Sequence, residues 1–316
     1  MIRKTILTAG LCVLAVLALS ACQSAGLLQG EGFVEVTGGK VWYKIVGSGE
    51  RTPLLVLHGG PGSSSVYLKP LEALAADRPV IFYDQLGCAS SPGPSDTTLW
   101  TIERFVEEIT QVREALGLKE IHLYGHSWGT MLAVDYMLNR PAGVSSLVLA
   151  SPALSVPRWI HDADSLLGAL PDSVQEVIRH HEREKTTDSP EYQSAVMVYY
   201  GQYLARRQPW SDDVNSAFAQ MNLAMYGYMW GPSEFTSTGT LSDYDRTDRL
   251  GEITIPTLLT AGQFDEATPA TVKYYQSLIP GAEFALLKNC AHFTMHDDPE
   301  TDIKIIRDFL AQVESK

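Results

Sequence analysis

Short apolar runs alternate with amphipathic segments over the first half of the chain. Apolar runs open residues 54–60, 80–87, 121–125 and 145–151, and each stretch ends in glycine or serine. Runs without polar alternation are typical of strands that are buried on both faces of a parallel sheet. Between them, residues 101–117 place six apolar side chains on one helical face: Ile102, Phe105, Val106, Ile109, Val112 and Leu116. This spacing predicts an amphipathic helix.

A hairpin and a long helical insertion complete the pattern. Residues 33–47 form two alternating runs around Gly38-Gly39, which predict a β-hairpin. Residues 152–248 contain no convincing strand and are rich in helical segments. Strand patterns resume at 255–262 and 282–289, and a last helix is predicted near 299–315. Strands that alternate with helices indicate a parallel sheet with right-handed crossovers.

The predicted fold class is therefore α/β, with a mostly parallel sheet and a helical cap inserted after the sixth or so strand. The sheet and its flanking helices would be formed by residues 32–151 and 249–316, and the cap by residues 152–248. A chain of 316 residues is long enough for one large domain that carries such an insertion.

The N-terminal segment is predicted to lie outside this fold. Arg3 and Lys4 precede an apolar run that ends at Cys22. A short positive segment, an apolar stretch and small residues before a cleavage site are typical of a secretory signal. We therefore expect residues 1–21 to be a signal peptide and residues 22–31 to be a short tether.

The sequence LSAC, which ends at Cys22, resembles the lipobox of bacterial lipoproteins, in which the cysteine carries the lipid and becomes the first mature residue. The resemblance implies an exported lipoprotein that is anchored to a membrane and faces the periplasm or the cell surface. An ordinary signal peptide and an uncleaved anchor are the alternatives. The apolar run is slightly shorter than the roughly 20 residues that span a membrane.

Charge and cysteine content exclude several classes of protein. The formal net charge is −13, and no run of Lys or Arg interrupts it. Such a chain would repel phosphates, so we expect no nucleic-acid partner. Outside the N-terminal segment only Cys88 and Cys290 remain, which excludes a disulfide framework. Two buried free thiols are expected, and a single disulfide between them is the alternative.

The sequence GHSWG at residues 125–129 fits the pattern G-x-S-x-G between a predicted strand and a predicted helix. At such a turn the serine hydroxyl is exposed above the sheet, at the start of the helix. Ser127 is therefore the candidate nucleophile, and a small residue at a tight corner is the alternative reading. Its predicted oxyanion donors are the backbone N–H groups of Trp128 and Gly60, with Gly59 as the alternative to Gly60.

A serine nucleophile needs a base and an acid that orients the base. In this kind of fold the chain order is Ser, then Asp or Glu, then His. Asp265 follows one late strand and His292 follows the next, so both are expected at the ligand-binding edge of the sheet. His296 is the competitor for the base and lies further from its strand. A triad of this kind needs no cofactor and no metal.

Six motifs together resemble the proline iminopeptidase family of α/β-hydrolases: HGGPG, DQLGCASS, GHSWGT, GPSEF, GQFDEATP and CAHFTMHDDPE. The match runs from about Glu31 to the C-terminus, and the chain is similar to the prolyl aminopeptidases and the archaeal tricorn-interacting aminopeptidase. The resemblance implies an α/β-hydrolase fold and a serine exopeptidase. Such an enzyme releases the N-terminal residue, proline or another apolar residue, from short peptides through an acyl-enzyme intermediate.

By the same resemblance, Glu234 and Glu266 hold the free α-amine of the substrate. A solvated loop acid is the alternative reading for each. The chain departs from the family at Leu86, where many members have Arg, and at Ala89, so we expect a change in pocket polarity. Three aromatic residues in the cap are expected either to line the pocket or to lie in the core: Tyr226, Tyr228 and Trp230.

Two other functions are compatible with the same motifs. The first is an esterase, a lactonase or an amide hydrolase of small molecules that uses the same triad. The second is an inactive relative that only binds a ligand, because one scaffold can host many functions. Two carboxylates at the acyl pocket distinguish the exopeptidase from the first alternative, since an ester hydrolase has no need of them.

Overall fold

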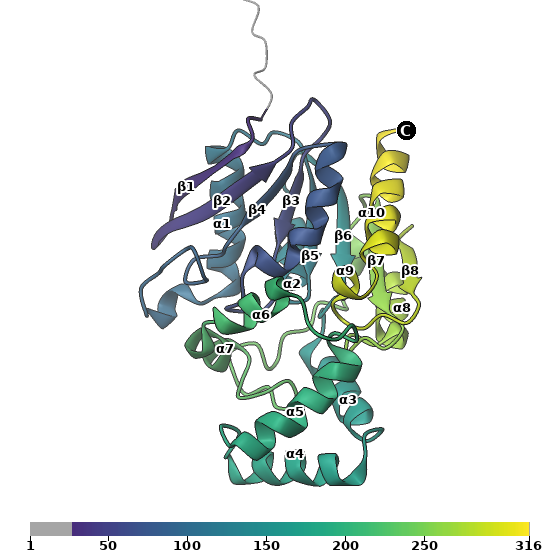
Figure 1. Ribbon diagram of the computed structural model, residues 1–316. Helices are drawn as coiled ribbons and strands as arrows, with labels where there is room; N and C mark the ends of the chain where they lie inside the picture. The colour runs from purple at the N-terminus through teal and green to yellow at the C-terminus, as the bar shows by residue number, and fades with distance from the viewer. Residues whose placement is uncertain (1–26, 316) are drawn as a thin grey trace, which may run out of the picture.

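The computed structural model of the chain describes residues 27–315 as one eight-stranded sheet surrounded by helices (Figure 1). The strand order is β1-β2-β4-β3-β5-β6-β7-β8. The first two strands pair in antiparallel fashion, β2 pairs antiparallel with β4, and all the remaining pairs are parallel. The strands are β1 (Gly30–Val36), β2 (Gly39–Val46), β3 (Leu54–Leu57), β4 (Val80–Tyr83), β5 (Ile121–His126), β6 (Val144–Ala150), β7 (Thr257–Gly262) and β8 (Glu283–Leu287).

The predicted N-terminal hairpin is present, but its turn is displaced by one residue. Gly39 pairs with Val36, so the turn consists of Thr37 and Gly38, and Gly38 has a φ of +95°. The first strand begins at Gly30, so the last two residues of the predicted tether belong to the sheet. The predicted signal peptide and Cys22 lie outside the described residues.

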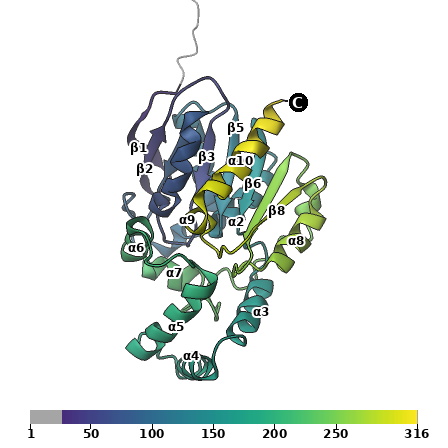
Figure 2. The ribbon, with the colours of Figure 1, turned by 45° about the vertical axis from the view of Figure 1, so that its right-hand side comes forward.

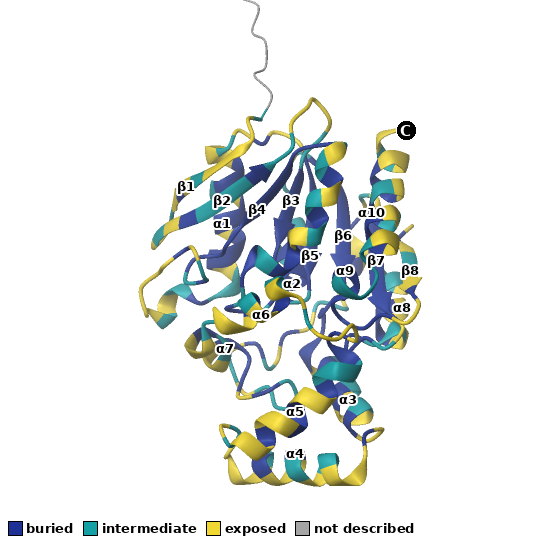
Figure 3. Cartoon of the chain, in the orientation of Figure 1, coloured by how far each residue is buried: buried dark blue, intermediate teal, exposed yellow. Residues whose placement is uncertain are grey.

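Both faces of the central strands are buried, which explains why their sequences lack polar alternation. Leu55 and Leu57 face a core formed with α1 (Ile102–Ala115), α2 (Trp128–Leu138) and α8 (Pro269–Leu278). Leu54 and Val56 face the opposite core, which is completed by η1 (Ser65–Ala76) and α10 (Pro299–Glu314). Figure 3 shows these strands buried along their lengths. The mostly parallel α/β architecture is thus confirmed.

The segment between β6 and β7 forms a group of helices at one end of the sheet (Figures 1 and 2). It contains α3 (Val156–Leu167), α4 (Asp172–Glu184), α5 (Pro190–Tyr203), α6 (Asp212–Ala219) and α7 (Leu223–Met229). Ile178, Tyr192 and Tyr199 belong to an apolar cluster within this group. The short elements η2 (Thr97–Leu99), η3 (Leu250–Glu252) and α9 (Thr294–Asp297) complete the described chain.

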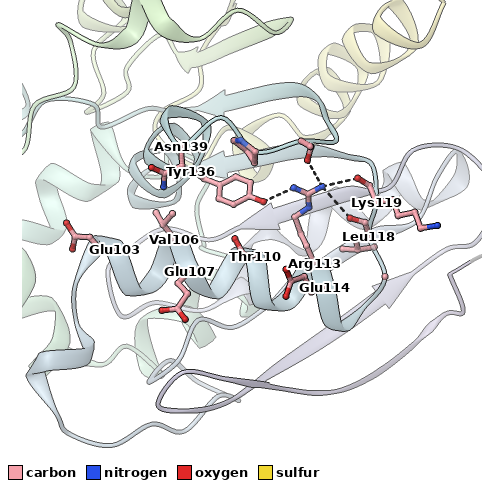
Figure 4. Close-up of a pocket in the computed structure, with 13 residues that line it drawn as sticks. Glu103, Val106, Glu107, Thr110, Arg113, Glu114, Leu118, Lys119, Tyr136 and Asn139 are labelled. Carbon is pink, nitrogen blue, oxygen red and sulfur yellow. Dashed lines mark hydrogen bonds between the residues drawn. The ribbon is translucent and has the colours of Figure 1, made fainter.

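Arg113 fastens the loops at the edge of the sheet from which β5 and β6 start. Its Nη1 donates to the Tyr136 hydroxyl at 2.6 Å, and its Nη2 donates to the carbonyl oxygens of Lys119 and Ala142 at 3.0 and 3.1 Å (Figure 4). A surface cavity of about 710 Å³ lies beside this side chain. Because its Nη atoms donate to groups of the protein itself, Arg113 stabilises the two loops that contain Lys119 and Ala142.

The two cysteines of the described residues and the lengths of the helices bear on further expectations. Cys88 and Cys290 are buried and free, which confirms the expected pair of thiols. Within residues 27–315, none of the helices combines the length and the apolar content needed to cross a membrane.

Candidate active site

Ser127 occupies a strained turn between β5 and α2. Its backbone has a φ of 54° and a ψ of −123°, which a non-glycine residue adopts only at a cost of about 1–3 kcal/mol. The flanking glycines permit this turn. A Cβ on Gly125 would lie 2.4 Å from the carbonyl oxygen of Gly129, and a Cβ on Gly129 would lie 2.3 Å from that of Leu57. The G-x-S-x-G pattern is thus explained by backbone contacts that leave no room for side chains.

Asp265 and His292 are brought together from the loops that follow β7 and β8. His292 Nδ1 lies 2.8 Å from Asp265 Oδ1, and both side chains are buried. The Asp265 carboxylate also accepts hydrogen bonds from Ser151 Oγ at 2.6 Å and from the N–H groups of Gly262 and Ala267. Because an ionised carboxylate can only accept, Nδ1 of His292 carries the proton and Nε2 is left as the basic atom.

Ser127 and His292 line the same cavity, whose volume is about 270 Å³. The Ser127 hydroxyl forms no hydrogen bond in the part of the chain that the structure describes, so its approach to His292 Nε2 would have to tighten when a substrate binds.

His296, the competitor for the base, has a different role. Its Nε2 lies 2.6 Å from the Tyr67 carbonyl oxygen, and its Nδ1 lies 3.2 Å from Ser211 Oγ, so this ring braces the loops and is not paired with Asp265.

The N–H groups of Gly60 and Trp128 are both available for a negatively charged oxygen. Both residues line the cavity, and neither N–H group makes a hydrogen bond to the described backbone. The alternative donor, Gly59, is engaged, because its N–H donates to the Tyr67 hydroxyl at 2.6 Å. This difference favours the N–H group of Gly60 over that of Gly59 as the second oxyanion donor.

A buried chain of hydrogen bonds that sequence reasoning missed connects three parts of the site. The Gly59 N–H donates to the Tyr67 hydroxyl, which lies 2.9 Å from His126 Nδ1. His126 Nε2 lies 3.0 Å from the carbonyl oxygen of His292. Since a carbonyl can only accept, His126 is protonated at Nε2 and accepts from Tyr67 at Nδ1. Burial lowers the pKa of His126 well below its usual value, which keeps the ring neutral for this role.

Glu266 and Glu234 place two carboxyl groups in the same cavity. Glu266 is buried, and its Oε2 has no hydrogen-bond partner among the described residues. Burial, and then the nearby carboxylates of Glu234 and Asp265, raise the pKa of Glu266 well above its usual value. Burial also raises the pKa of Glu234, which accepts a 2.5 Å hydrogen bond from the Tyr226 hydroxyl. Two neighbouring acids, of which Glu266 is buried with an unused oxygen and Glu234 is half-buried, are suited to a cationic ligand.

The turn that presents Glu234 is held from outside the cavity by Glu182 on α4. One oxygen of Glu182 accepts from Ser233 Oγ at 2.5 Å, and the other accepts from Thr236 Oγ1. The Tyr192 hydroxyl donates to the same carboxylate. Ser233 and Thr236 flank Glu234 on both sides, so Glu182 fixes the direction of that side chain. No sequence motif marked Glu182, because its partners in the turn of Glu234, Ser233 and Thr236, lie more than 50 residues away.

Two expectations about the pocket wall were wrong. Leu86 and Ala89 do not line the cavity, and Leu86 is buried against Gly38 and Gly39 in the core. Their departure from the family pattern therefore does not change the polarity of the pocket. Tyr226 and Trp230 do line the cavity, whereas Tyr228 is 41% exposed and packs edge-on against Trp100.

Across residues 27–315, no group of three or more His, Cys, Asp or Glu side chains is arranged to hold a metal ion.

The chain is similar to known proteins over most of its length. The family model described as "alpha/beta hydrolase fold" matches residues 52–299. A proline iminopeptidase from Heyndrickxia coagulans is 49% identical over 287 residues, which cover 90% of this chain and 99% of the relative. The crystal structure of a proline iminopeptidase from Mycobacterium smegmatis superposes with a TM-score of 0.84 at 33% identity, over 90% of this chain and 98% of the other. The crystal structure of VinJ gives a TM-score of 0.87 at 34% identity, over 90% and 99% of the two chains.

The hydrogen-bonded chain through Tyr67 can be tested with a serine-reactive fluorophosphonate. Tyr67→Phe leaves the Gly59 N–H and His126 Nδ1 without a partner, at a cost of about 1–3 kcal/mol for each buried group. We expect Ser127 to be modified about tenfold more slowly, since about 1.4 kcal/mol in a barrier corresponds to one factor of ten. The rate of modification is followed by intact mass.

Tyr83→Phe is the matched control. Tyr83 is also buried, but its hydroxyl has no hydrogen-bond partner among the described residues. The control should react at the rate of the unaltered protein. Equal rates for Tyr67→Phe and Tyr83→Phe would show that the chain of hydrogen bonds does not position the site.

Proposed function

The chain belongs to the proline iminopeptidase family of α/β-hydrolases, and we propose that it is a serine exopeptidase that releases the N-terminal residue, proline or another apolar residue, from short peptides. The observation that carries the proposal is the pair of acids in the cavity of Ser127. Glu266 has an unused buried oxygen, and Glu234 lies in the wall of the same cavity. An exopeptidase must recognise a free ammonium group at a fixed distance from the scissile carbonyl, and this pair can do so.

The proposed reaction begins with attack of Ser127 Oγ on the carbonyl carbon of the first residue. His292 Nε2 takes the hydroxyl proton, and Asp265 stabilises the imidazolium that forms. The oxygen of the tetrahedral intermediate accepts hydrogen bonds from the N–H groups of Gly60 and Trp128. His292 then gives the proton to the departing nitrogen, which leaves an acyl-enzyme. A water molecule, activated by the same imidazole, releases the amino acid.

The partly apolar wall of the cavity is consistent with a small apolar first residue. Met131, Trp159 and Trp230 line it, together with the acids. These buried apolar side chains reduce the solvent around the acids, so the attraction to an ammonium group is stronger than it would be in bulk water. The ammonium group would in turn restore the ionised form of the carboxyl groups.

The alternative is an esterase, a lactonase or an amide hydrolase of small molecules that uses the same three residues. That reaction requires Ser127, His292 and Asp265 but no carboxylates for an ammonium group. The two functions therefore differ in how strongly activity depends on Glu266 and on a free N-terminus.

Glu266→Gln tests the proposal directly. The variant keeps the shape of the side chain and removes the charge that pairs with the ammonium group. We expect kcat/KM for a prolyl amide to fall by about 10²-fold, in keeping with a loss of about 2–3 kcal/mol for one charge-assisted contact. Activity on a simple ester without an amine should change much less. Initial rates on the two substrates give the comparison.

Glu184→Gln is the control, because Glu184 is an exposed acid on α4 and should tolerate the change.

Acetylation of the substrate's N-terminus should abolish cleavage by the unaltered protein. The advantage of the free amine should also weaken as the pH falls through the raised pKa values of the two acids, because neutral carboxyl groups do not pair with an ammonium ion. Equal loss on amide and ester, or cleavage of the acetylated peptide, would favour the alternative function.

We also propose that the protein is exported and anchored to a membrane by lipid on Cys22. The support is the sequence LSAC after an apolar run, which fits a lipobox. Anchoring would place the enzyme where it meets short peptides outside the cytoplasm. Two or more acyl chains give stable membrane binding, whereas one chain gives only marginal binding.

Cys22→Ala should move the protein from the membrane fraction to the soluble fraction of its host. Cys12→Ala is the matched control and should leave the protein in the membrane fraction, because Cys12 lies inside the apolar run. Immunoblots of separated fractions give the result. Membrane association that survives Cys22→Ala would contradict a lipid anchor at that residue.

A further inference from the structure

Five of the residues that line the cavity of Ser127 are exposed, and three of them are apolar side chains on three different helices; the other two are Gln193 and Pro232. Met197 on α5 is 48% exposed, Phe218 on α6 is 37% exposed, and Leu223 at the start of α7 is 73% exposed. All three line the cavity. We call these three residues the apolar rim.

Isolated apolar residues on a protein surface need no explanation, but a group at one opening does. The rim residues come from three separate helices of the segment between β6 and β7, and Figure 1 shows α5, α6 and α7 gathered at the same end of the sheet. Met197 and Leu223 could be polar with little effect on the buried core, because about half or more of each side chain is exposed. Phe218 also stacks on Trp210. Their apolar character is thus suited to a ligand that passes through the opening.

The cavity also lacks any positive side chain. Among the described residues that line it, none is Lys or Arg, and the only acids are Glu234 and Glu266. The net charge of the chain is −13. A substrate whose free C-terminal carboxylate lay near the opening would find no cation to pair with and a negative field around it.

The direction of a bound peptide follows from the positions of the other groups. Its ammonium end would lie against buried Glu266, and its first carbonyl would lie at Ser127. The residue after the scissile bond must then point away from the acids, toward the opening. The apolar rim belongs to the exposed part of the cavity wall.

We propose that the apolar rim binds the second residue of the substrate and selects peptides in which that residue is apolar and carries no free carboxylate. This inference rests on the proposed function, and it names the substrate class within it. The preferred substrates are short peptides with an apolar second residue whose C-terminus is amidated or lies further along the chain.

Three substrates with the same first residue test the proposal: Pro-Leu-NH₂, Pro-Leu with a free carboxylate, and Pro-Gly-NH₂. The unaltered protein should cleave Pro-Leu-NH₂ with a kcat/KM about tenfold or more above the other two, since several methylenes in an apolar site give that much discrimination. Leu223→Ser should reduce the value for Pro-Leu-NH₂ by about three- to tenfold. The same variant should leave the value for Pro-Gly-NH₂ within about twofold.

Leu286→Ser is the matched control, because Leu286 is 41% exposed on β8 and does not line the cavity. It should leave all three values unchanged. Leu223→Lys adds a cation at the opening, and it should narrow the gap between Pro-Leu and Pro-Leu-NH₂. Leu223 is largely exposed, so both of its variants should fold, and a thermal melt checks this.

The results distinguish failure of the rim proposal from failure of the proposed exopeptidase function. Cleavage of all three substrates at similar rates, or equal effects of Leu223→Ser on the leucyl and glycyl amides, overturns the role of the rim while the exopeptidase remains. If no substrate with a free N-terminus is cleaved, the proposed function itself fails, and the rim has no peptide to select.

Discussion

The constraint on which the site depends is the close approach of backbone atoms around Ser127. A Cβ on Gly125 or Gly129 would lie within 2.4 Å of a carbonyl oxygen. Glycine at both positions permits this approach, so the chain passes from β5 directly into α2 with Ser127 at a positive φ. The hydroxyl therefore lies above the carboxyl edge of the sheet, where the loops that follow β3, β7 and β8 also begin. Without this turn, the acid and the base would have no nucleophile to act on.

Hydrogen bonds from the surrounding polar groups hold the loops around Ser127 in place. The carbonyl oxygen of Tyr203, at the end of α5, accepts from the N–H groups of both Glu266 and His292. The segment between β6 and β7 thus contacts the two loops that carry His292 and Glu266. From the other side, the Tyr67 hydroxyl and the His126 ring connect the Gly59 loop to the carbonyl of His292. The His292 loop is therefore held by hydrogen bonds from two sides: from Tyr203 at the end of α5, and from the Tyr67–His126 pair.

Sequence patterns predicted the residues whose role follows from local structure. Ser127 has a motif and a strand–helix context, and Asp265 and His292 each follow a strand whose end lies at the same edge. The contributions of Tyr67, Ser151 and Glu182 could not be predicted, because each forms a hydrogen bond to a residue far away in sequence: His126, Asp265 and Ser233, respectively. The expectations for Leu86 and Tyr228 were wrong for the same reason, since a side chain's direction depends on the tertiary packing.

The most direct test of the account is to trap the covalent intermediate on Ser127. The unaltered protein is mixed with a prolyl ester that has a free amine, quenched in acid within milliseconds, and digested for mass analysis. The account predicts a prolyl adduct on the peptide that contains Ser127, approaching one per chain, and no adduct in His292→Ala. An adduct on another residue, or steady turnover with no adduct on Ser127 at any quench time, would contradict it.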